Sequence, residues 1–151
     1  MCRIISVVKM FKIILIVLLW LPTSLWSQAF YSTNSISTSS VDVFITDSIA
    51  ISDVEVYIAT SIDIADVIFY PALCGIEYSD VSIYISDTLA ISDIDVYLSD
   101  TLAISDVNIY FSSNQDVADY ILCFPYSVNE QEVNEMGAAT AGYLYKNNLI
   151  D

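Results

Sequence analysis

Basic residues and histidine are almost missing from this chain of 151 residues. It has no His and 4 Lys and Arg against 19 Asp and Glu, and three of the four bases, Arg3, Lys9 and Lys12, lie near its start. A phosphate-binding surface needs Lys or Arg, so nucleic acid is not an expected partner. Acid–base catalysis by imidazole is impossible without histidine. From residue 30 onward, Lys146 is the one base among all the acids.

Glycine and proline are scarce as well, with three of each. Tight glycine turns are therefore few, and Asp, Ser and Thr are expected to close turns by bonding to nearby backbone groups. Hydrophobic residues make up 56% of the chain, with 11 Tyr and 6 Phe. That content is too high for a disordered chain, even at a net charge of −15. Ile, Val and aromatic side chains fit a pleated surface, so the core is expected to consist of strands.

The basic start leads into a short apolar run. Residues 13–21 (IILIVLLWL) are all apolar, Pro22 ends the run, and Ser27 and Ala29 occupy the −3 and −1 positions of a small-x-small cleavage site. A membrane span needs about 18–20 apolar residues, which this run does not reach. These features predict a secretory signal peptide and a secreted or periplasmic protein, without a stable membrane span after cleavage.

The chain is expected to divide into three parts. Residues 1–29 form the signal peptide, residues 30–39 form a short Ser/Thr-rich linker, and residues 40–151 form a single β-repeat domain. Both Met1 and Met10 are acceptable starts, because the basic and apolar parts of the signal follow either one.

Two cysteines, Cys74 and Cys123, remain once the signal peptide has removed Cys2. In an oxidising compartment two such residues can form a disulfide. Both also stand in apolar surroundings, PALCGI and YILCFPY, which suit buried thiols. The sequence leaves the two possibilities open.

A thirteen-residue unit is repeated through most of the chain, with one unit of fourteen. Two adjacent units, DVSIYISDTLAIS and DIDVYLSDTLAIS, are nearly identical. The second and fourth positions of a unit are apolar, the fifth is aromatic, and the twelfth is usually Ile or Val. The seven units begin at Ser40, Asp53, Asp66, Asp80, Asp93, Asp106 and Asp119.

Each unit predicts one strand and one turn. Apolar and polar residues alternate from the twelfth position of a unit through the sixth of the next, as in a half-buried strand. In the second unit, Val54, Val56 and Ile58 are expected to face inward. The turns, such as S-D-T, are expected to close through side-chain hydrogen bonds. The fourteen-residue unit contains Pro71 and Gly75 and is expected to carry a bulge or loop.

The segments SDVSIY, SDIDVY, SDVNIY and ADVIFY resemble the septoil-knot domain family, small bacterial β proteins of unknown function. The resemblance covers about residues 40–146, and AGYLYK (141–146) is similar to the family's Ala-Gly-aromatic ending. It implies an all-β fold in which the repeats are wound into a knot with seven crossings. The repeats alone predict a small parallel β-solenoid, the alternative fold. Residues 127–140 interrupt the repeat as a short helical or loop excursion before a final strand.

The aspartate columns are the candidate functional site. Like charges about 5 Å apart repel by roughly 1 kcal/mol even in water, so a regular column needs compensation. Backbone N–H groups can supply it, and so can Ca²⁺, which prefers oxygen ligands. Neither the glycine-rich GGxGxD repeat nor an EF-hand loop is present. The candidate calcium ligands are Asp53, Asp66, Asp80, Asp93, Asp106 and Asp119.

Recognisable catalytic motifs are missing: the chain has neither G-x-S-x-G nor D-[ST]-G. We therefore expect no catalytic or cofactor-binding residues. The sequence favours an exported, non-enzymatic structural or interaction module with a protein or surface partner. The alternative is a calcium-stabilised extracellular binding protein that uses the Asp columns. The aromatic column is expected to pack against a neighbouring layer rather than form an exposed stripe; its members are Phe44, Tyr57, Tyr70, Tyr84, Tyr97 and Tyr110.

Overall fold

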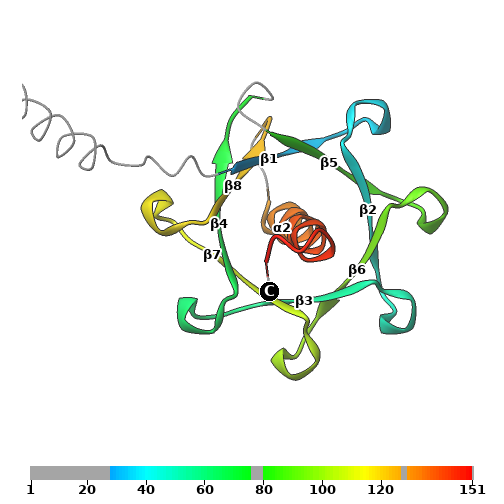
Figure 1. The fold of residues 1–151 in the computed structure, drawn as a ribbon. Helices are drawn as coiled ribbons and strands as arrows, with labels where there is room; N and C mark the ends of the chain where they lie inside the picture. Colours follow the sequence, from blue (N-terminus) through cyan, green and yellow to red (C-terminus); the bar gives the residue numbers. More distant parts are fainter. Residues whose placement is uncertain (1–27, 76–79, 127–128, 151) are drawn as a thin grey trace, which may run out of the picture.

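In the computed structural model, which describes residues 28–75, 80–126 and 129–150, the chain forms a closed barrel of eight parallel strands around one helix, α2 (Glu130–Lys146) (Figure 1). The expected signal peptide lies outside the described residues, except for its last two. The protein is mostly β, as predicted. The strands are β1 (Gln28–Thr33), β2 (Val41–Thr46), β3 (Val54–Ile58), β4 (Val67–Leu73), β5 (Val81–Ser86), β6 (Ile94–Ser99), β7 (Val107–Phe111) and β8 (Tyr120–Phe124).

The strand order around the barrel is β1-β5-β2-β6-β3-β7-β4-β8. Strands β1 to β4 occupy alternate positions and β5 to β8 fill the positions between them, so the chain goes around the barrel twice. Consecutive strands never pair with each other. In β6, for example, Ile94 lies opposite Val43 of β2, and Val96 lies opposite Val54 of β3. Every strand pair therefore joins parts of the chain that are far apart in the sequence.

Each connection within a circuit crosses one strand of the other circuit. Thr46, at the end of β2, lies opposite Tyr97 of β6, and Val54, at the start of β3, lies opposite Val96 of the same strand. The residues between them pass outside β6 as a projecting loop with one turn of 3-10 helix (Figure 1). We call these connections the lobes; they are residues 34–40, 47–53, 59–66, 87–93, 100–106 and 112–119. Their 3-10 helices are η1 (Ile36–Thr38), η2 (Ile49–Ile51), η3 (Ile62–Ile64), η5 (Leu89–Ile91), η6 (Leu102–Ile104) and η7 (Gln115–Val117).

The inward face of the strands follows the predicted alternation. Val54 and Val56 are buried, and Ile58 packs against the same core. The prediction for the twelfth position is wrong, because these residues lie in the 3-10 helices rather than in strands. The chain must first cross a strand of the other circuit, so each strand begins only at the second position of its unit. Ile51 and Ile104, for instance, are 47% and 48% exposed.

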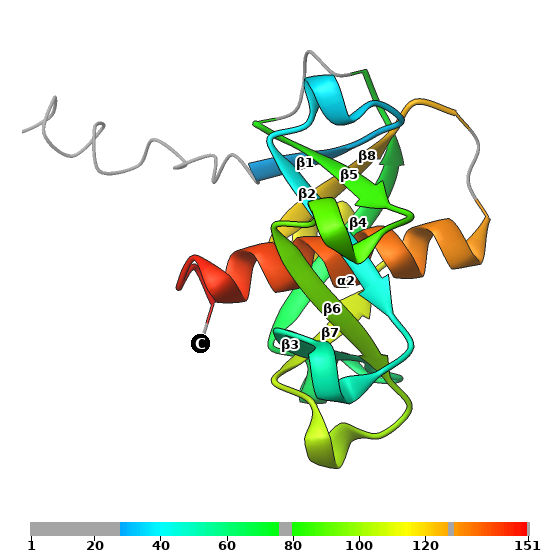
Figure 2. The same cartoon turned by 90° about the vertical axis from the view of Figure 1, so that its right-hand side faces the viewer.

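The helix α2 runs through the barrel and replaces the expected final strand. In Figure 2 its first turns lie on one side of the barrel wall and its last turns on the other. Residues 141–146 belong to this helix, not to a strand. A strand inside the barrel would have no neighbour for its backbone groups, whereas a helix bonds its own. The helix starts with a capping box, in which Asn129 and Glu132 exchange side-chain-to-backbone hydrogen bonds.

The segment expected as a linker is part of the barrel. Residues 30–33 belong to β1, which pairs with β5 and β8 and closes the barrel, and residues 36–38 form η1. With β1, the described residues hold eight strands, one more than the seven units counted in the sequence. The expected cleavage position after Ala29 falls inside β1, where Ala29 is buried and its carbonyl accepts the N–H of Asp80.

Candidate functional site

The aspartate columns cap the starts of the strands. The N–H of Asp106 donates to the Glu55 carbonyl at 2.7 Å, and its Oδ2 accepts the Glu55 N–H at 2.9 Å. One residue thus satisfies both backbone groups of a residue on the adjacent strand. This arrangement supplies N–H partners for the carboxylates, the first of the two forms of compensation expected. The same pair of bonds joins Asp53 to Asp95, Asp66 to Asn108, Asp80 to Ala29, Asp93 to Asp42, and Asp119 to Ile68.

The column aspartates do not form a metal cluster with one another. Within the described ranges, no group of three or more His, Cys, Asp or Glu side chains comes together in a way that could hold a metal ion. The calcium hypothesis stays a prediction, without a ligand set from these residues.

The turns close as predicted, through hydroxyl groups. Ser99, the last residue of β6, accepts the N–H of Thr101 at 3.1 Å and donates to the Thr101 carbonyl at 2.8 Å. Ser86 and Ser112 make the same pair of bonds with the residues two positions ahead. These hydrogen bonds of the Ser hydroxyl groups therefore close the turn at the start of the lobe without a glycine, and the chain continues outward.

The lobes carry most of the exposed aliphatic side chains of the described residues. Four lobes present a pair of them at positions i and i+2 of the 3-10 helix, so both project from the same turn. Contiguous exposed apolar patches are a feature of interaction sites, and these pairs recur around the barrel. These side chains, 40–49% exposed, are Ile36, Ile49, Ile51, Ile62, Ile64, Leu89, Ile91, Leu102, Ile104 and Val117.

Exposed carboxylates accompany these aliphatic side chains. Five of the six lobes hold an acid next to or within the 3-10 helix, in addition to the column aspartate at the end of the lobe. Lobe 34–40 is the exception, since it contains only Asn, Ser, Ile and Thr. The acids are Asp47, Asp63, Asp87, Asp100 and Asp116, all exposed.

Two of the lobes begin beside a hollow of about 720 Å³ at the end of the barrel where α2 starts. Ile45, Leu98 and the ring of Tyr97 give it an apolar surface. Its acids come from three elements, so the surroundings of the hollow are strongly negative. The remaining lining residues are Thr46, Asp47, Asp100, Glu130, Gln131, Asn134 and Glu135. We call this the acidic hollow.

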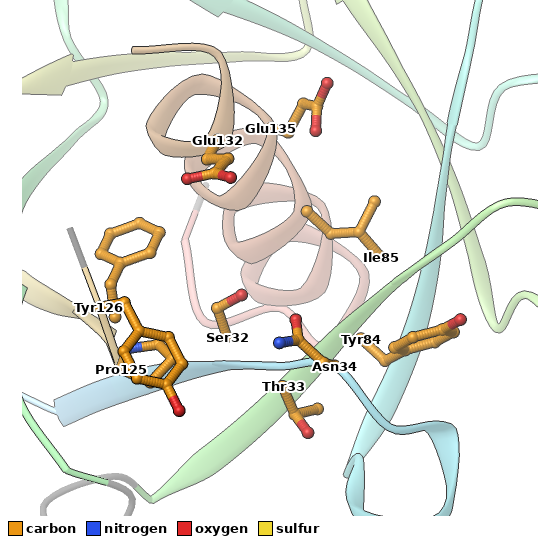
Figure 3. A pocket seen from close by; sticks show the side chains of 10 residues that line it. Ser32, Thr33, Asn34, Tyr84, Ile85, Pro125, Tyr126, Glu132 and Glu135 are labelled. Atoms are coloured by element: carbon orange, nitrogen blue, oxygen red, sulfur yellow. The ribbon is translucent and has the colours of Figure 1, made fainter. Parts of the chain in front are cut away.

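A smaller cavity of about 240 Å³ lies at the same end of the barrel (Figure 3). Glu132 and Glu135 reach it from α2, and Ser32 reaches it from β1. Both acids already serve the helix: Glu132 accepts the Asn129 N–H, and Glu135 accepts the Gln131 side-chain amide at 2.7 Å. We assign no reaction to this cavity.

Lys146, the single base of the domain, lies at the C-terminal end of α2, away from the acidic hollow. Lys146 Nζ donates to Asp53 Oδ2 at 2.8 Å and to the Asp93 carbonyl at 3.3 Å. The Lys146 hydrogen bond lowers the pKa of Asp53 below its ordinary value of 3.8. Elsewhere, burial and the neighbouring charge of Asp119 raise the pKa of Tyr120 above 10.0.

The two cysteines form a disulfide. Cys74, just after β4, is bonded to Cys123 of β8, 49 residues further along the chain. Cys123 is buried, whereas Cys74 is half-buried beside a surface cavity of about 330 Å³. The sequence left open a disulfide or two buried thiols, and the structure contains the disulfide.

The side chains of the aromatic column are half-buried. Those of Tyr57, Tyr84 and Tyr97, for example, alternate along the strands with the inward residues. The interior of the barrel is filled by α2.

The sequence predicts the column aspartates as candidate site residues but not the exposure of the lobe aliphatics. The Ile or Val at the twelfth position fits a strand pattern, and a residue in a half-buried strand is not expected to be exposed. The repeated Leu-Ala-Ile at 89–91 and 102–104, directly after a turn, was the available signal.

Comparison with known proteins gives no relative. No family model, curated protein or solved structure matches the chain. Across the described residues, no helix combines the length and the apolar character that crossing a membrane requires.

Proposed function

We propose that the protein is an exported, non-enzymatic interaction module whose lobes and acidic hollow bind a partner segment with both aliphatic and basic side chains. The observation that carries this proposal is the repeated pairing, in five of the six lobes, of exposed aliphatic side chains with an exposed carboxylate. The barrel holds these lobes at fixed positions, so the surface is organised before it meets the partner.

Charge favours a basic partner over a second copy of the chain. The domain has one base against 19 acids, so two copies repel each other. A Lys or Arg side chain entering the acidic hollow gains from four carboxylates: Asp47, Asp100, Glu130 and Glu135. Its neighbours on the partner can cover Leu102 and Ile104 of the adjoining lobe.

Export is supported by the sequence and by the disulfide. The basic start, the apolar run and the small-x-small site have the order of a signal peptide. Structural disulfides persist mainly in oxidising compartments, outside the cytosol. The proposed location is therefore the periplasm or the exterior of the cell.

We propose in addition that the fold is knotted in the septoil manner. The two interleaved circuits and the passage of α2 through the barrel support this proposal. Protein chains generally do not thread through their own loops, so a knot is a specific proposal that a single experiment can contradict.

Calcium-stabilised binding stays the alternative. The column aspartates already accept backbone N–H groups, so the calcium hypothesis has no particular observation in its favour.

The interaction proposal is tested with a synthetic helical peptide of Leu and Lys, and with a Ser and Lys peptide of equal charge. At physiological salt, the protein is expected to bind the Leu peptide at least ten-fold more tightly, as measured by titration calorimetry. The double variant Leu102→Ser/Ile104→Ser leaves the charge unchanged and is expected to remove most of that difference.

The matched control is Ile36→Ser in lobe 34–40, which carries an exposed aliphatic residue without an acid in its lobe. This variant is expected to bind like the unaltered protein. Equal affinity for both peptides would reduce the binding to general charge attraction and contradict the proposal.

A further inference from the structure

We infer that the Cys74–Cys123 disulfide closes a covalent ring around α2, so that the protein is threaded through a ring of its own chain. This inference concerns how the fold is locked and is independent of the partner. It follows from the course of residues 74–123 around the barrel and from the position of the helix.

Residues 80–123 run around the wall of the barrel through β5 to β8. From β5 the chain passes through β6 and β7 to β8, filling every second position of the wall. The end of β4 and the start of β5 lie in the same sector, where only β8 and β1 separate the two strands. The disulfide joins β8 to the end of β4, where Ala72 lies opposite Cys123. The circuit is therefore closed by covalent bonds.

The helix α2 follows directly after this ring and passes through it. Figure 1 shows α2 inside the wall, and Figure 2 shows its two ends on opposite sides of the barrel. Gly137 packs against Phe111 and Ile109 of β7, and Gly142 packs against Val96 of β6. Both strands are part of the ring.

The passage for the helix is narrow at Gly142. A Cβ on Gly142 would lie 2.6 Å from the Cγ2 of Val96, so this position accepts no side chain without a shift. Leu144, which is fully buried, and Tyr145, which is partly buried, follow toward the C-terminal end and pack against the core. Withdrawal of the helix would drag them through the narrow section. With the ring closed, α2 is retained; with the ring open, β4 and β8 can separate and release it sideways.

A dithiol reductant opens the ring in a two-electron step. One reagent thiolate attacks the Sγ of Cys74, the half-buried sulfur, and Cys123 leaves as a thiolate that takes up a proton. The second reagent thiolate then displaces Cys74, which is also protonated, and the reagent becomes a disulfide. The Sγ–Sγ bond is broken, and two thiols are formed.

The test places a stopper on the threaded end. A small domain that stays folded in guanidinium is fused to the C-terminal end of the full chain. The oxidised fusion is unfolded, held in denaturant and then refolded. Its tail cannot leave the ring, so it is expected to refold at least ten-fold faster than the oxidised protein without the fusion, whose tail can slip out. Refolding is followed by circular dichroism at 222 nm.

Two controls separate threading from a general effect of the disulfide. The same domain added as a separate protein is expected to leave the refolding rate unchanged. In the dithiol-reduced protein and in the Cys74→Ser/Cys123→Ser variant, the C-terminal fusion is expected to have no effect. Equal refolding rates of the oxidised protein with and without the C-terminal stopper would overturn the inference.

Discussion

Single aspartates fix the strand register of this barrel. Each column Asp bonds both backbone groups of one residue on the neighbouring strand, so a one-residue slip would break both bonds. The sequence predicted that the carboxylates need compensation, and the structure identifies the compensating groups as backbone N–H. The positions of those groups could not be predicted, because the partners are 42 or 51 residues away in the chain.

Replacing Asp106 by Ala removes the acceptor for the Glu55 N–H. We expect the free energy of unfolding to fall by about 1 kcal/mol, the usual net value of one hydrogen bond. Asp106→Asn retains an acceptor oxygen and is expected to lose less. The measurement is urea unfolding followed by circular dichroism.

Asp100→Ala is the matched control for this loss, since it removes the same charge from an exposed lobe position. Its effect is expected to stay within about 0.5 kcal/mol, as for most surface changes. If Asp100→Ala destabilised the protein as much as Asp106→Ala, the capping role of the column would be wrong.

At the scale of elements, the strands were predictable and the helix was not. Alternation at the second and fourth positions predicted the inward face, including Val54 and Val56. The segment 141–146 is rich in aromatic residues and matched a strand-like ending, so the capping signal Asn-x-x-Glu at 129–132 was overlooked. From Met136 to Gly142 every residue of the helix is buried, so this part has no amphipathic pattern, because the barrel surrounds it.

The fit of α2 depends on its glycines. Gly→Ala in an exposed helix normally stabilises by about 1 kcal/mol. We expect Gly142→Ala to destabilise the protein by about 1–3 kcal/mol, since its Cβ meets a branched side chain on a buried strand. Urea unfolding measures the change.

Shortening the Val96 side chain tests whether its contact with the new methyl group causes the destabilisation. Val96→Ala is expected to cost less stability in the Gly142→Ala background than in the unaltered protein, so the two changes are not additive. Additive losses would show that the contact with Val96 is not the source of the destabilisation.

At the scale of the molecule, two circuits of one chain interleave around a threaded helix. The thirteen-residue repeat explains this arrangement only in part: each unit supplies a strand and a lobe long enough to cross one strand. Each unit pairs with units of the other circuit through long-range contacts. These contacts depend on the filling of the barrel interior and on the pairing of β1 with β8, which closes the barrel. Periodicity alone does not determine it.

The most direct test of the proposed knot is to stretch the chain between its two ends in an optical trap, with the disulfide reduced. An unknotted chain extends to about 3.5 Å per residue. We predict an extension that stays short of this length at high force, because the knot tightens instead of opening, whereas a chain ending at residue 126 reaches it. Full extension of the complete chain would contradict the knotted fold.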